Sequence, residues 1–310
     1  MLKVIKPGIF TTIQDAGRVG FQQYGIIVSG AIDRVAYRIG NALLNQHNKA
    51  ALEMTLIGGV YRFTKQSTIV LTGGQMMATL NDKPIHMYQP VPVKAGDLLK
   101  CGVIQSGMRS YLCITGGFLV EEVLNSSSTY LRAELGGYYG RRLQAGDCLS
   151  YEELASNHTT FQYNASAFYT QEPIRILKGS EWDQFRHHEQ ESFLKQSYSI
   201  SVESDRMGYR LQGQQPISIN NSFQLLSEAV TFGTVQLPPS GQPIVLMVDR
   251  QTTGGYPKIA QIITADLHRF SQLSPKQTVQ FELVTIEQAE ESYFQLEQQL
   301  RLLELLISHQ

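Results

Sequence analysis

Apolar residues occur along this chain in short runs rich in β-branched side chains, and clusters of glycine, proline, asparagine and aspartate separate the runs. Such spacing is typical of β-barrels and β-sandwiches, so the pattern predicts a mainly β fold. We expect strands at residues 67–72, 111–115, 173–177, 243–248 and 278–285.

Helical patterning is limited to residues 33–44, residues 181–195 and the C-terminus. The C-terminal stretch is the most regular, because its apolar residues alternate in steps of three and four, as in a heptad seam. They are Ile286, Ala289, Tyr293, Leu296, Leu300, Leu303 and Ile307. Two interpretations are open: a helix that packs on its own barrel, and a helix that is offered to a partner protein.

Two short patterns recur and indicate repeated barrel-like construction. Ala-Gly-Asp-x-Leu occurs at residues 95–99 and 145–149, and each copy is expected to be a turn that leads into a strand. Thr-Gly-Gly occurs at residues 72–74, 115–117 and 253–255, where glycine pairs suit bulges, tight barrel corners or the close approach of the backbone to a ligand.

A polar segment without a clear period, residues 152–171, is the candidate linker between two halves. A chain of 310 residues is long enough for two domains. We predict an N-terminal β domain at residues 1–155, a C-terminal β-barrel domain at residues 170–285 and an amphipathic helix at residues 286–308.

The composition excludes several classes of protein. A formal net charge of −1 and scattered Lys and Arg residues give no basic surface for nucleic acid or anionic lipid. No export signal and no run long enough to span a membrane is present, so we expect a cytoplasmic protein. The odd number of cysteines fits a reducing compartment, and Cys101, Cys113 and Cys148 are expected as core residues.

The familiar signatures of autonomous catalysis are absent, including GxxxxGK[ST], GxGxxG after a strand, HExxH and GxSxG. His187, His188 and Glu189 resemble metal ligands, but neighbouring residues of a helix point about 100° apart and do not share one ion easily. We therefore expect no metal site in this chain.

Two segments of the N-terminal half concentrate polar residues and glycines. In residues 7–20, Asp15 and Arg18 flank a glycine turn, either as a local ion pair or as ligand-binding groups. In residues 29–33, Ser29 and Asp33 precede a predicted helix. Free amides at that position hold anions, whereas Asp33 acts as a helix cap or orients a donor.

Two further segments lie in the C-terminal half. Residues 204–210 place Arg206 and Arg210 around a glycine, and arginine forks bind carboxylate or phosphate unless Asp205 pairs with one of them. Residues 249–260, DRQTTGGYPKIA, follow a predicted strand, at whose end barrels carry their sites. There Asp249 is a candidate base or orienter, Lys258 a candidate cation, and Gln251 and Thr252 are candidate hydrogen-bond donors.

Together these segments resemble the allophanate hydrolase subunit 2 family over nearly the whole chain. The family's motifs stand at residues 7–20 (PGIFTTIQDAGRVG), 29–33 (SGAID), 52–59 (LEMTLIGG), 128–147 (STYLRAELGGYYGRRLQAGD), 204–211 (SDRMGYRL), 236–247 (QLPPSGQPIVLM) and 249–260 (DRQTTGGYPKIA). One departure bears on ligand binding, because Ser127 stands where the family has an arginine. An anion contact of the family near that position is therefore in doubt for this chain.

The resemblance implies two cyclophilin-like β-barrel domains and a multi-subunit enzyme. The family includes the C subunit of the bacterial ATP-dependent 5-oxoprolinase, which works with a B subunit similar to allophanate hydrolase subunit 1 and with an A subunit of the LamB/YcsF type. ATP is then a cofactor of the complex. Carboxybiotin is implied only if the chain is half of a biotin-dependent carboxyltransferase of the urea carboxylase type. A third alternative is a regulator that antagonises a histidine-kinase inhibitor.

The proposed substrates share a planar amide, which needs a donor for its oxygen, a base or orienter for its nitrogen and a cation for transferred charge. The residues expected to supply these groups are Arg206, Arg210, Asp249, Gln251 and Lys258. The isolated chain is expected to be inactive.

Overall fold

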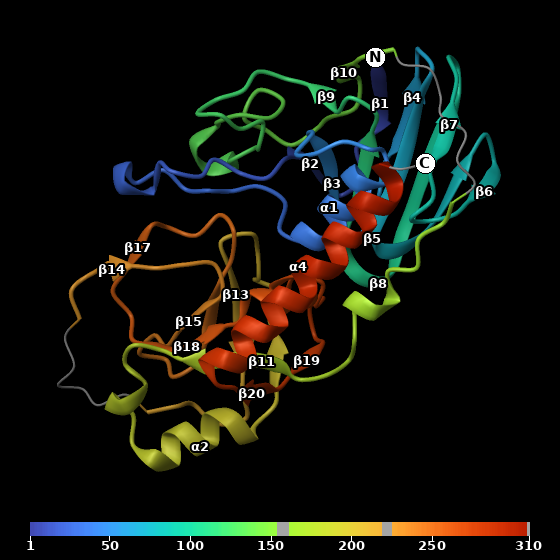
Figure 1. Ribbon diagram of the computed structural model, residues 1–310. Helices are drawn as coiled ribbons and strands as arrows, with labels where there is room; N and C mark the ends of the chain where they lie inside the picture. Colours follow the sequence, from blue (N-terminus) through green and yellow to red (C-terminus); the bar gives the residue numbers. More distant parts are fainter. Residues whose placement is uncertain (154–160, 219–224, 309–310) are drawn as a thin grey trace. The chain divides into compact units, whose positions relative to one another are not determined.

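The computed structural model describes residues 1–153, 161–218 and 225–308 (Figure 1). Contacts within the chain divide it into two compact units. The first unit comprises Met1–Arg18, Ser29–Tyr169 and Gln299–Gln310, and the second comprises Val19–Val28 and Thr170–Gln298.

The first unit is built on one antiparallel sheet that curls into a nearly closed barrel, with the order β2-β3-β8-β4-β1-β10-β9 and with β5 pairing β6, β7 and β8. Its described strands are β1 (Leu2–Lys6), β2 (Phe10–Gln14), β3 (Ala51–Thr55), β4 (Val60–Phe63), β5 (Ser67–Leu80), β6 (Lys83–Ile85), β7 (Val91–Val93), β8 (Leu98–Ile114), β9 (Phe118–Leu119) and β10 (Cys148–Tyr151).

The long strands β5 and β8 form the centre of this sheet (Figure 1). The first eight residues of β5 are buried without alternation, which is typical of a strand covered on both faces. Helix α1 (Arg34–Ala42) supplies the second cover, because it contacts both β5 and β8. The pairing of β5 with β8 shifts register between Gly73 and Gln75, so the first Thr-Gly-Gly lies at a bulge as predicted.

The two Ala-Gly-Asp turns have the same local structure. Gly96 and Gly146 have φ angles of 94° and 95°. The carboxylates of Asp97 and Asp147 each accept a hydrogen bond at 2.7 Å from the amide three residues before. Strands β8 and β10 start directly afterwards, which confirms the prediction that each turn leads into a strand.

Helix α1 lies so close to the sheet that Gly40 has no room for a side chain. A Cβ atom at Gly40 would lie 2.5 Å from Cys113 Sγ and 3.1 Å from Thr72 Oγ1. Both neighbours are buried, so they have little freedom to move away. The glycine therefore sets the distance between the helix and the sheet.

We expect the substitution Gly40→Val to lower the free energy of unfolding by about 2–3 kcal/mol, because the added atoms overpack a rigid contact. Urea denaturation with an unchanged m-value measures the loss. Gly255→Ala is the matched control, because a Cβ there meets its nearest neighbour at an ordinary 3.4 Å. Equal stability of the Gly40→Val variant and the parent would refute this tight packing.

The second unit contains an eight-stranded, nearly closed sheet with the order β19-β12-β13-β16-β15-β18-β11-β20 and a separate pair, β14-β17. Its described strands are β11 (Ile174–Lys178), β12 (Tyr198–Ile200), β13 (Gly208–Gln212), β14 (Glu228–Ala229), β15 (Thr234–Gln236), β16 (Ile244–Leu246), β17 (Thr253–Gly254), β18 (Lys258–Ile262), β19 (Thr278–Val279) and β20 (Phe281–Leu283). An aromatic cluster fills part of its core: Trp182, Phe193, Tyr198 and Phe281.

Three further α-helices occur among the described residues: α2 (His187–Lys195), α3 (Leu267–Ser271) and α4 (Ile286–Ser308). The predicted C-terminal helix is confirmed. Leu300 and Leu303 of its seam are buried, and Glu304 pairs with Arg38 of α1 at 3.2 Å, so the last turns pack within the first unit. Phe294 is 65% exposed, and binding of this helix to a partner protein stays a prediction.

The mainly β fold class is confirmed, whereas two details of the sequence interpretation are wrong. The strand expected at residues 278–285 is divided, because β19 pairs with β12 while β20 pairs in parallel with β11. Cys148 is exposed rather than in the core, because burial alternates along β10 and Cys148 falls on the outer face.

Within the predicted linker, residues 154–160 lie outside the described residues. The predicted domain boundaries stay predictions.

Candidate functional site

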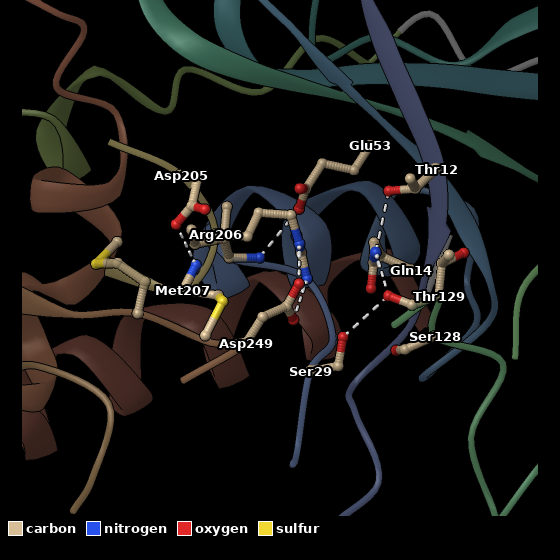
Figure 2. A network of polar contacts seen from close by, with 12 residues as sticks. Thr12, Gln14, Ser29, Glu53, Ser128, Thr129, Asp205, Arg206, Met207 and Asp249 are labelled. Atoms are coloured by element: carbon tan, nitrogen blue, oxygen red, sulfur yellow. Dashed lines mark hydrogen bonds and ion pairs between the residues drawn. The ribbon is translucent and has the colours of Figure 1, made fainter. Parts of the chain in front are cut away.

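A buried ion pair joins two of the sequence-predicted residues of the second unit. Arg206 donates through Nε to Asp249 Oδ2 at 2.9 Å and through Nη2 to Oδ1 at 3.1 Å (Figure 2). Both side chains are less than a tenth exposed. The backbone adds to the pairing, because the Asp249 amide donates to the Arg206 carbonyl at 2.8 Å. The two hydrogen bonds fix the plane of the guanidinium group. Arg206 lies just before the start of β13, and Asp249 lies just after the end of β16.

Asp205 has a local structural role. Its Oδ1 accepts hydrogen bonds from the amides of Met207 at 2.8 Å and Gly208 at 3.1 Å, which closes the turn before β13. Figure 2 shows this carboxylate directed at its own turn. The alternative in which Asp205 pairs with Arg206 therefore gives way to a pair between Arg206 and Asp249.

Arg210 is not brought together with Arg206. It projects from the outer face of β13, where alternate residues are exposed, and its Nε lies 3.9 Å from Glu203 Oε2. Its side chain is 56% exposed. Surface pairs of this kind contribute little energy, so the contact with Glu203 does not prevent Arg210 from binding a ligand. Because Arg210 lies on the outer face of β13, such a ligand must approach from solvent.

Lys258 lies between two carboxylates. Its Nζ is 2.5 Å from Glu228 Oε2 and 3.7 Å from Glu181 Oε1, and its side chain is only 12% exposed. Its backbone amide also donates to Glu181 Oε2 at 2.7 Å. A negative charge on a ligand therefore competes with Glu228 and Glu181 for this cation.

The two other predicted residues that follow Asp249 are at least partly open to solvent. Gln251 is exposed and Thr252 is half-buried. The Thr252 carbonyl accepts a hydrogen bond from the Val230 amide at 3.0 Å, which continues the pairing of β14 with β17. The side chains of both residues are thus presented from a short anchored hairpin.

In the first unit, Asp15 and Arg18 both bind the segment at residues 126–128. Asp15 accepts hydrogen bonds from the Ser126 hydroxyl at 2.8 Å, the Ser127 amide at 2.5 Å and the Ser128 hydroxyl. Arg18 Nη2 donates to the Ser128 carbonyl at 2.5 Å. Asp15 therefore binds residues 126–128 and does not form the local ion pair with Arg18 that was one of the two interpretations. Ser127 is held through its backbone amide.

Ser29 is buried in a left-handed conformation, with a φ angle of 55°. Its hydroxyl donates to the Thr129 carbonyl at 3.1 Å, and Gln14 Nε2 donates to the same carbonyl at 3.2 Å (Figure 2). Gln14 Oε1 is buried and has no hydrogen-bond partner among the described residues. A buried acceptor normally receives a hydrogen bond, so the unsatisfied Gln14 Oε1 makes Gln14 a candidate functional residue. The sequence interpretation missed it.

Asp33 caps helix α1 and belongs to a buried network. Its Oδ1 accepts from the Ala36 amide, and its Oδ2 accepts from the Tyr169 hydroxyl, both at 2.9 Å. Glu53 Oε2 accepts from the Ile32 amide at 3.0 Å and from the Tyr111 hydroxyl at 2.7 Å. The Ile32 and Ala36 amides near the start of α1 are thus occupied within the protein, which favours the capping interpretation over anion binding.

Sequence reasoning missed Glu53 and its partners. Glu53 is fully buried, and Arg109 Nε lies 3.9 Å from its Oε1. The available signal was a carboxylate inside the otherwise apolar run LEMTLIGG, since Glu is almost never fully buried unless it is paired. Burial, and then the charges of Glu53 and Asp33, raise the pKa of Tyr111 well above its ordinary value.

This network predicts alkaline unfolding. Burial, and then the charge of Asp33, also raise the pKa of Tyr169 well above its ordinary value. In the unfolded chain these phenols deprotonate near pH 10. Stability is therefore full below pH 10 and falls as the pH rises further, by about 1.4 kcal/mol per pH unit for each tyrosine. Urea denaturation midpoints measured between pH 8 and 11.5 give the slope of stability against pH. The variant Tyr111→Phe should have a smaller slope. Stability that does not change over this pH range would contradict the prediction.

The described residues contain neither a metal-binding cluster nor a membrane-spanning helix. No group of three or more His, Cys, Asp and Glu side chains is placed to hold a metal ion there. No helix within the same ranges has both the length and the apolar character that a membrane crossing requires. His187 and His188 instead lie near Glu191 at 3.3 Å and Glu189 at 3.1 Å.

Comparison with known proteins decides the family. The profile of the carboxyltransferase domain, subdomain A and B, matches residues 24–283. The chain belongs to the carboxyltransferase domain family. The match includes Arg206, Asp249 and Lys258, so the carboxyltransferase domain contains the second-unit residues described above.

Individual relatives of this carboxyltransferase-domain chain refine the comparison. It is 41% identical to the C subunit of 5-oxoprolinase from Haemophilus influenzae over 291 residues, which are 93% of each chain. It is also 41% identical to the C subunit of 5-oxoprolinase from Escherichia coli K12 over 290 residues, again 93% of each chain. The crystal structure of Kluyveromyces lactis urea carboxylase superposes with a TM-score of 0.90 at 27% identity, covering 97% of this chain and 29% of that one.

Proposed function

We propose that this chain is the C subunit of an ATP-dependent 5-oxoprolinase, which opens 5-oxo-L-proline to L-glutamate together with the A and B subunits. The observation that carries the proposal is the 41% identity to two proteins named as C subunits of 5-oxoprolinase, across 93% of their length and of this chain. ATP belongs to the complex in this proposal, and no residue of this chain is assigned a nucleotide contact.

The proposed catalytic group is Arg206, Asp249 and Lys258. Arg206 polarises the amide oxygen, because its guanidinium carries a permanent positive charge and two hydrogen bonds to Asp249 fix its orientation. Asp249 is then a positioning residue rather than a free base, since both of its oxygens accept from Arg206. Lys258 supplies a cation for transferred charge when Glu228 yields its contact at 2.5 Å.

The other predicted binding residues divide into two sets by exposure. Gln251, Thr252 and Arg210 are proposed to contact substrate, which their solvent-facing positions support. Asp15, Arg18, Ser29 and Asp33 are proposed to hold binding segments of the first unit in place, a role that their buried hydrogen bonds support.

The carboxyltransferase half of a biotin-dependent urea carboxylase is the second candidate. It is favoured by the family's name and by the close superposition on urea carboxylase. The lower identity, 27% against 41%, favours the oxoprolinase assignment instead. ATP hydrolysis stimulated by 5-oxoproline supports the first proposal, and stimulation by urea, in the presence of a biotin carboxylase and a biotin carrier, supports the second.

Substitution of the proposed catalytic group tests the site. Lys258→Ala and Asp249→Asn variants, reconstituted with the A and B subunits, should form glutamate from 5-oxoproline at least about 100-fold more slowly than the parent, as expected for the loss of a charged catalytic contact. Lys195→Ala is the matched control, because that lysine is exposed and pairs only across one helical turn. Full activity of both variants would sink the site assignment.

A further inference from the structure

A hollow of about 480 Å³ lies in the first unit, and none of the residues proposed above as catalytic or substrate-binding lines it. Its walls come from the loop that connects β9 to β10, drawn in green in Figure 1, and from β10 itself. The residues that line it are Leu119, Val120, Glu121, Val123, residues 134–140 and residues 148–150. Its volume is within the range of sites that hold small groups.

The loop that forms this hollow has an unfavourable backbone conformation. Glu134 and Tyr139 line it with φ angles of 50° and 54°, and Leu124 lies close by in the chain at 55°. Left-handed conformations cost non-glycine residues of order 1 kcal/mol each and cluster where ligands are bound. Gly140 packs against Glu134 so closely that a Cβ would lie 2.0 Å from the Glu134 carbonyl carbon. The loop is thus held tightly in a costly shape.

Two adjacent tyrosines form the aromatic wall. The rings of Tyr138 and Tyr139 meet edge to face with centroids 4.8 Å apart, and Tyr139 is 79% exposed. The Arg141 guanidinium already lies 5.1 Å from the Tyr138 ring, where two hydrogen bonds to Asp147 hold it. This ring pair therefore lies in a setting that favours cations.

The charges of the lining have one sign. Glu121 and Glu134 are its only charged residues, and neither forms a salt bridge within the described part of the chain. No lysine or arginine of residues 1–153, 161–218 or 225–308 lines the hollow. Phosphates and carboxylates are repelled from such a site, whereas an ammonium or guanidinium group is attracted by both the carboxylates and the rings.

We propose that this hollow receives an arginine or lysine side chain of a partner protein within the enzyme complex. The inference rests on the proposed function for the existence of the partner. A protein partner fits because the rim exposes apolar surface, with Leu119 at 49% and Tyr139 at 79%, and exposed tyrosines are typical anchors of protein interfaces. The carboxylates then pair with the cation of the partner when the rim is covered.

Cys148 provides a native reporter, because it lines the hollow and is exposed while the other two cysteines are buried. Purified chain is treated with N-ethylmaleimide alone and after addition of the purified A and B subunits. We expect the partners to slow labelling of Cys148 at least about 10-fold. The double variant Glu121→Gln, Glu134→Gln and the variant Tyr139→Ala should each bind the partners about 10-fold more weakly.

Glu122→Gln is the matched control, because Glu122 is exposed and adjacent in sequence but does not line the hollow. A complex that forms while Cys148 reacts at the free rate overturns the proposal, and so does the absence of any complex. If N-acetyl-arginine-methylamide slows the labelling of Cys148 and the partner proteins do not, the proposal is also overturned, because the hollow then binds a small free cation and not a side chain of a partner. Protection in a complex that makes no glutamate leaves the inference standing and refutes the proposed function.

Discussion

Asp249→Asn will lower the free energy of unfolding by about 3–5 kcal/mol, because it removes the negative partner of a buried guanidinium. Arg206 and Asp249 are each less than a tenth exposed and are joined by two hydrogen bonds of 2.9 and 3.1 Å. Urea denaturation, followed by circular dichroism at constant m-value, measures the loss.

The double variant Arg206→Met, Asp249→Leu separates stability from function. Replacement of a buried pair by apolar residues of similar size is often neutral or stabilising, so we expect this variant to recover most of the stability that Asp249→Asn loses. It should nevertheless remain without activity in the reconstituted enzyme. Recovery of activity together with stability would reduce the pair to a structural element.

Asp15→Ala will lower the free energy of unfolding by about 3 kcal/mol or more. This carboxylate accepts hydrogen bonds from the amides of Gly17 and Ser127 and from the hydroxyls of Ser126 and Ser128. Each buried donor that loses its acceptor costs about 1–3 kcal/mol, and some of that cost is relieved by water. Thermal and urea unfolding of the variant measure the effect.

Asp82→Ala is the control for this prediction. Asp82 also carries a carboxylate with a close partner, Lys100 at 2.5 Å, but its side chain is 79% exposed. Exposed pairs contribute about 0–1 kcal/mol, so this variant should retain nearly all of the stability. Comparable losses at Asp15 and Asp82 would contradict the assignment of Asp15 as the buried anchor of residues 126–128.

Local signals in the sequence predicted much of the fold. The Ala-Gly-Asp turns, the bulge at Gly73 and the C-terminal helix follow from backbone preferences that act within a few residues. The pairing of Arg206 with Asp249 was not predictable in the same way, because the two residues are 43 positions apart and meet only when β13 pairs with β16. Sequence proximity favoured Asp205 instead.

Burial was the second property that the pattern left open. Cys148 has apolar neighbours on one side, but alternation along β10 places it on the outer face. The sequence gives no sign that Lys258 has a charged partner. In the structure its ammonium group lies beside the carboxylates of Glu181 and Glu228, which are 77 and 30 positions before it. Glu53 was hidden for the opposite reason, since its hydrogen-bonding partners come from distant segments that only the closed sheet brings together.

The most direct test of the account is the rate of glutamate formation from 5-oxo-L-proline and ATP, measured with the purified A and B subunits before and after addition of this chain. We predict no measurable glutamate without the chain, saturation when it is equimolar with its partners, and one ADP released for each glutamate formed. Glutamate formation at the same rate in its absence, or none in the complete mixture, would contradict the account.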